Sequence, residues 1–129
     1  MIFTPKGFLI VGGIVLVLIG LLGFKVIGPG TDGLFGSTWY FDNAENWTHL
    51  IIGLVGLIAA FALPSGTQKG LVMLVGIVAL FFAVYNIFRM DFMGANLERP
   101  ADLILHLVVG IWALMASRGK SQMLPSQPM

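Results

Sequence analysis

The chain has 129 residues, of which 57% are hydrophobic and 10% are charged, and its formal net charge is +1. A soluble domain carries about 25% charged residues, so these are too few to cover a water-solvated surface, and the small net charge gives no sign of nucleic-acid binding. The chain contains no cysteine, which excludes disulfides, thiolate metal sites and cysteine nucleophiles.

Four apolar runs are predicted to be transmembrane helices, because each is close to the roughly 20 residues that cross a hydrocarbon core. In chain order they are 7–27, 47–63, 70–88 and 101–117. Turn-forming sequences separate them, namely Gly28-Pro29-Gly30, Pro64-Ser65-Gly66 and Arg99-Pro100. We therefore expect one all-α integral membrane domain over 1–117, followed by a flexible cytoplasmic tail over 118–129.

The apolar runs form a tandem repeat of a two-helix hairpin. Lys6-Gly7 opens the first run and Lys69-Gly70 opens the third, 63 residues later. The second run contains His49 with Gly53 four residues on, and the fourth contains His106 with Gly110, at an offset of 57. Since a two-helix unit returns the chain to its starting side, the repeats 4–63 and 67–117 are predicted to be parallel and related by an axis along the membrane normal.

The charged residues predict the orientation. The loop between the first and second runs and the loop between the third and fourth runs lie on one side of the membrane. All six acids belong to these two loops: Asp32, Asp42, Glu45, Asp91, Glu98 and Asp102. Lys6, Lys69, Arg118 and Lys120 lie at the opposite side, against Lys25, Arg89 and Arg99 at the acidic side. The excess of Lys and Arg marks the cytoplasmic side, so both termini are predicted to be cytoplasmic. Trp39 and Trp47 are expected in an aromatic belt at the outer interface.

Two histidines define the candidate site. His49 and His106 lie in the first turns of the second and fourth helices, and each follows an acid by four residues, Glu45 and Asp102. Residues four apart share a helix face, and the small residues that continue each stripe indicate close helix approach. We therefore expect both histidines to point into the bundle at the same membrane face.

Three interpretations of this cluster stay open. In the first it is structural: Asp42 and Glu45 have the spacing of a capped helix start, Asp102 favours the helix dipole, and the histidines make ordinary hydrogen bonds. In the second, Glu45, His49, Asp102 and His106 bind a divalent metal such as zinc. In the third, His49 and His106 are axial ligands of a haem or a chlorophyll-type pigment.

The segment Asn46-Trp47-Thr48-His49-Leu50 with Gly53, and His106-Leu107 with Gly110, resemble a family of small four-helix bacterial membrane proteins known as a domain of unknown function. The resemblance covers 7–117, but Leu103 stands where the family pattern has a second asparagine. It implies the fold and a bacterial inner membrane, and it adds nothing about activity.

The sequence offers no recognisable catalytic set, and the middle of each apolar run lacks ionisable residues, which disfavours ion or proton transport. We therefore predict a non-enzymatic protein of the lipid bilayer, an accessory or scaffolding subunit of a membrane complex or a homo-oligomer, without a cofactor. The alternative is a protein that binds haem, a pigment or a metal through His49 and His106.

Overall fold

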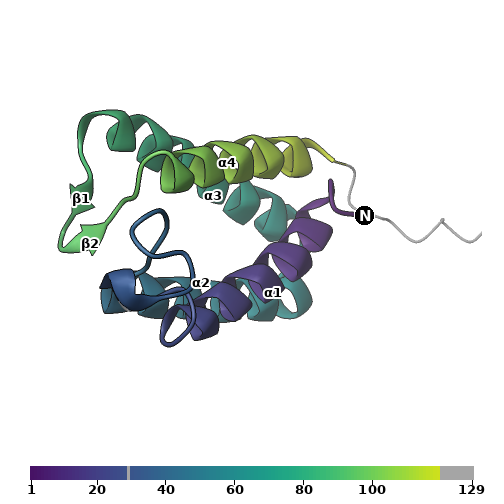
Figure 1. Cartoon of the computed structure of the whole chain (residues 1–129). Coiled ribbons are helices and arrows are strands. Elements are labelled where there is room, and N and C mark those ends of the chain that lie inside the picture. The colour runs from purple at the N-terminus through teal and green to yellow at the C-terminus, as the bar shows by residue number, and fades with distance from the viewer. Residues whose placement is uncertain (29, 120–129) are drawn as a thin grey trace, which may run out of the picture.

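The computed structural model describes residues 1–28 and 30–119. These residues form the helices α1 (Pro5–Gly23), α2 (Asn43–Ala62), α3 (Ser65–Phe88) and α4 (Ala101–Arg118), a 3-10 turn at Gly30–Asp32, and the strands β1 (Asp91–Phe92) and β2 (Ala95–Asn96) (Figure 1). All four α-helices of this described part are long and apolar enough to cross a membrane. The chain is thus a multi-pass, helical membrane protein, as predicted, and most of the predicted tail, 120–129, lies outside the described residues.

The helix boundaries differ from the predicted ones where local hydrogen bonds extend or end a helix. α1 ends at Gly23 rather than at residue 27, because the backbone N–H groups of Val26 and Ile27 both donate to the carbonyl of Leu22 and turn the chain. α3 begins at Ser65, since Pro64 has the extended conformation of an N-cap residue and the helix starts directly after it. The predicted turn at 64–66 is therefore shorter than expected.

Equivalent contacts hold each hairpin together, which confirms the repeat. A glycine on one helix faces a larger side chain on its partner, so closely that an added Cβ would lie 2.7–3.0 Å from that side chain. The matched pairs are Gly13–Leu57 with Gly76–Leu114, and Gly53–Val17 with Gly110–Leu80. Their positions follow the 63- and 57-residue offsets, and small residues are what allow membrane helices to approach closely.

The hairpins meet near the chain termini. α1 packs along α2 and also contacts α3 and α4. The buried apolar core lies there, at Phe8, Leu9, Ala59, Ala60, Val72, Ala113 and Ala116. Gln68 of α3 donates its side-chain amide to the carbonyls of Ala59, Ala60 and Leu63 at 3.3, 2.9 and 3.0 Å. It thereby supplies a donor to carbonyls at the end of α2, where Ala59 also accepts the backbone N–H of Leu63.

The opposite end of the bundle carries the polar connections. The loop between α1 and α2 and the β1–β2 hairpin both lie at this end, away from the N-terminus (Figure 1). Strand β1 pairs antiparallel with β2, with Asp91 opposite Asn96 and Phe92 opposite Ala95. This end contains the starts of α2 and α4, and therefore the predicted site.

The close α1–α2 contact predicts that Gly53→Ala destabilises the protein. The added Cβ would lie 2.8 Å from the Gly13 carbonyl oxygen and from the Val17 backbone nitrogen, and backbone atoms cannot rotate away. We expect a loss of about 1–3 kcal/mol in the free energy of unfolding, seen as a lower thermal midpoint in detergent.

Gly70→Ala is the matched control, because nothing lies within 4 Å of a Cβ added at that helical position. Alanine is the better helix former, so its midpoint should be unchanged or higher. Equal midpoints for the two variants would contradict the close contact.

Candidate functional site

The start of α2 is closed by the capping box that the sequence predicts. The Asp42 carboxylate accepts the backbone N–H of Glu45 at 2.8 Å, and the Glu45 carboxylate accepts the backbone N–H of Asp42 at 3.0 Å. These reciprocal bonds satisfy donors that a helix start leaves free. They also explain why α2 begins at Asn43, four residues before the predicted start.

The start of α4 uses a different arrangement for the same purpose. Pro100 stands at the N-cap and has no side-chain hydrogen bond to offer. Asp102, buried in the first turn, accepts the backbone N–H of Glu98 at 2.6 Å and the indole N–H of Trp39 at 3.2 Å. Asp102 lies 57 residues after Glu45, so equivalent acids of the repeat both hold the chain segment that enters their helix.

Each long loop also reaches across to the helix start of the other half. Trp39, from the first loop, donates to Asp102 of α4. Asn96, from the second loop, donates its backbone N–H to the Asp42 carboxylate at 2.7 Å. Residues 39 and 96 are separated by 57 positions, which is also the offset between equivalent residues of α2 and α4. The two loops therefore make comparable contacts with the other half, although the acceptors differ, because Asp102 corresponds to Glu45 and Asp42 corresponds to Arg99.

Glu98 connects these contacts into one chain of hydrogen bonds. Its carboxylate accepts the side-chain amide of Asn96 at 2.7 Å, and its carbonyl accepts the amide of Asn86 from α3 at 3.3 Å. The Tyr40 hydroxyl also donates to the Glu98 carboxylate, and this bond raises the pKa of Tyr40. Hydrogen bonds thus run without a break from the start of α2, through β2, to the start of α4.

The buried carboxylates of this layer are held by neutral donors. Glu45, Glu98 and Asp102 are each more than 90% buried. Among residues 1–28 and 30–119 the one ion pair joins Arg89 to Asp91 at 3.8 Å, and both side chains are exposed. The acids near the histidines therefore act as hydrogen-bond acceptors at helix starts, which supports the structural interpretation.

The structure places His49 and His106 at the same end of the bundle, in different surroundings. His106 Nδ1 lies 2.8 Å from the backbone carbonyl of Asp102, and its ring lies beside Phe82. His49 Nδ1 is buried without a hydrogen-bond partner among the described residues, and its ring lies 5.2 Å from that of Phe41.

The predicted metal ligands do not converge in the part of the chain that the structure describes. No group of three or more histidine, aspartate or glutamate side chains is placed there to hold a metal ion. The Asp102 carboxylate is occupied by two donors, and Glu45 turns back to Asp42. The metal site at Glu45, His49, Asp102 and His106 stays a prediction without support from this geometry.

Two asparagines that are not among the predicted site residues are fully buried at this end. Asn46 of α2 fills the space that Gly23 leaves on α1, and neither of its side-chain polar atoms has a described hydrogen-bond partner. In the second half, Asn86 stands at the position of Gly23 and Leu103 at that of Asn46. The asparagine therefore lies on the second helix of the first hairpin and on the first helix of the second hairpin, and the 63- and 57-residue offsets are the signal that shows this exchange.

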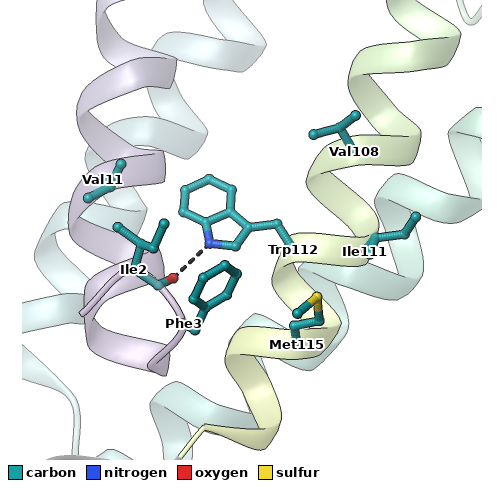
Figure 2. A pocket seen from close by; sticks show the side chains of 7 residues that line it. All are labelled: Ile2, Phe3, Val11, Val108, Ile111, Trp112 and Met115. Atoms are coloured by element: carbon teal, nitrogen blue, oxygen red, sulfur yellow. Dashed lines mark hydrogen bonds between the residues drawn. The ribbon is translucent and has the colours of Figure 1, made fainter.

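A groove that the sequence does not predict lies at the terminal end of the bundle. Its volume is about 500 Å³, and its lining consists of Ile2, Phe3, Val11, Val108, Ile111, Trp112 and Met115 (Figure 2). The Trp112 indole N–H donates to the carbonyl of Ile2 at 2.7 Å, which fixes the N-terminal segment against α4. The groove is apolar and distant along the helices from both histidines.

Comparison of the chain with family models, curated proteins and solved structures finds no match. The resemblance to the bacterial four-helix family therefore stays a prediction.

Asp102→Ala is expected to destabilise the protein by about 1–3 kcal/mol, because the buried N–H of Glu98 and the Trp39 indole lose their acceptor. Asp91→Ala removes an exposed carboxylate of the same end and should change the thermal midpoint little. Trp39→Phe should cost less in the Asp102→Ala background than alone, and fully additive losses would contradict the cross-loop bond.

Proposed function

We propose that this chain is a non-enzymatic accessory or scaffolding subunit of a membrane complex. The observation that carries the proposal is how little of each helix is covered. Within the described residues, 28–33% of each membrane-spanning window is buried. In that same part of the chain, the extensive packing of α2 is against α1, and Gln68 of α3 contacts the end of α2. The uncovered faces present large apolar side chains, such as Ile58 and Phe61 of α2.

The arrangement of the polar end supports this role. Its carboxylates and loop donors are engaged with one another, so they fix the two hairpins rather than meet a substrate. A bundle with an internally bonded polar end and open apolar flanks is suited to packing within the bilayer, where close van der Waals contact drives helix association.

The proposed setting is a bacterial inner membrane with both termini in the cytoplasm. In the sequence, Lys6, Lys69, Arg118 and Lys120 flank the helix ends nearest the termini, against Lys25, Arg89 and Arg99 near the acidic ends. Because an excess of Lys and Arg marks the cytoplasmic side, this distribution favours cytoplasmic termini.

A second candidate function is cofactor binding, which the hydrogen bond of His106 favours. If Nδ1 donates to the Asp102 carbonyl, Nε2 keeps a lone pair that can coordinate a haem, a pigment or a metal. Backbone carbonyls orient ligand histidines in this manner. His49 would supply the second ligand, since its Nδ1 lacks a described partner.

Site-specific photocrosslinking in native membranes tests the accessory role. A photoreactive residue at Ile58, which is 65% exposed on α2, should link to one protein species at constant stoichiometry. Leu34, in the first loop and 74% exposed, is the control and should give no such product. Only lipid adducts at Ile58, with a monomer free of partners after mild detergent extraction, would contradict the proposal.

The cofactor candidate predicts an absorption band or about one metal per chain in protein purified from its native membrane. His106→Ala should abolish either signal, and His49→Ala should weaken or shift it. Absorption spectroscopy with elemental analysis makes the measurement. A colourless, metal-free preparation would remove this candidate and leave the accessory role unaffected.

A further inference from the structure

We infer that the groove between the N-terminal segment, α1 and α4 binds an acyl chain of an anionic phospholipid, whose phosphate lies beside Arg118. This site lies at the opposite end of the bundle from the histidines. It concerns lipid selectivity, so it goes beyond the proposed accessory role and can fail or succeed independently of it.

The walls of the groove suit a hydrocarbon chain. Figure 2 shows Ile2 and Phe3 on one side, Val11 on α1, and Val108, Ile111 and Met115 on α4, with the Trp112 ring between the helices. The indole N–H is already bonded to the Ile2 carbonyl, so this donor needs no partner from the ligand. The volume of about 500 Å³ lies within the usual range of ligand sites.

Arg118 lies where a headgroup would leave this groove. Val108, Ile111, Met115 and Arg118 follow one another at spacings of three and four, so they share one face of α4. Arg118 is exposed in the last turn and forms no ion pair with any other residue in the described ranges. A guanidinium can bind phosphate through two parallel hydrogen bonds.

The charge of this end selects the sign of the headgroup. The described charged side chains here are Lys6, Lys69 and Arg118, and the described acids lie at the other end. The Lys6 ammonium lies over the Phe61 ring of α2, 5.3 Å from its centroid, and is thus engaged away from α4. Anionic lipids are attracted to such basic membrane-proximal sites. These observations favour a phospholipid over a transmembrane helix as the occupant.

Quenching of Trp112 fluorescence tests the inference. The full chain is placed in phosphatidylcholine vesicles that contain brominated phosphatidylglycerol or, at equal mole fraction, brominated phosphatidylcholine. The Trp112 signal is the difference between the protein and its Trp112→Phe variant, because Trp39 and Trp47 also emit. We expect half-quenching at roughly fivefold lower mole fraction of the anionic lipid, the effect of about one well-placed cation.

Matched charge variants separate a site from general surface attraction. Arg118→Gln should abolish the preference, whereas Lys69→Gln, which removes the same charge from α3, should keep it. Circular dichroism verifies that both variants retain their helices. Equal quenching by the two lipids, equal effects of the two variants, or no Trp112 quenching by either lipid would overturn the inference. The last result would mean that polypeptide fills the groove.

Discussion

The arrangement of the two halves depends on the hydrogen bonds that each long loop makes to the helix start of the other half. A helix start leaves backbone N–H groups without partners, and the need for acceptors is strongest near the hydrocarbon, where water is scarce. Asp42 accepts the N–H of Glu45 in the first turn of α2, and Asp102 accepts the N–H of Glu98 just before α4. Each also accepts a donor from the other half, from Asn96 and from Trp39. Because the same carboxylate holds the start of its own helix and the loop of the other half, the two contacts depend on each other.

These hydrogen bonds give the acids near the histidines a structural role. On the sequence they have the composition of a metal site, but in the folded chain their oxygens face backbone amides, an asparagine side chain and an indole. Within the described residues, the cluster leaves available Nε2 of His106 and the unpartnered Nδ1 of His49. The surfaces that can meet other molecules lie elsewhere, on the open helix flanks and in the terminal groove.

The sequence predicts features that local chemistry determines. Apolar length defines the membrane spans, the repeated glycines predict the contacts within each hairpin, and the spacing of Asp42 and Glu45 predicts the capping box. It does not predict the bonds from Trp39 to Asp102 or from Asn96 to Asp42, which join residues 63 and 54 positions apart through loops without a periodic pattern. Trp39 suits an interfacial belt by composition, and only the folded loop turns its indole toward Asp102. The sequence does not predict the groove for the same reason. Its wall at Ile2 and Phe3 is held in place by the hydrogen bond from Trp112, 110 residues from Ile2.

Hydrogen exchange measured residue by residue in micelles tests these two hydrogen bonds between the halves most directly. The backbone amide of Asn96 and the indole N–H of Trp39 both lie in inter-helix connections at the polar end, yet both are bonded to carboxylates of the other half. We expect both to exchange far more slowly than the amide of Met93, which is 90% exposed at the tip of the β1–β2 hairpin. Exchange of Asn96 and Trp39 as fast as that of Met93 would contradict this expectation, because the halves would then be held by the helices alone.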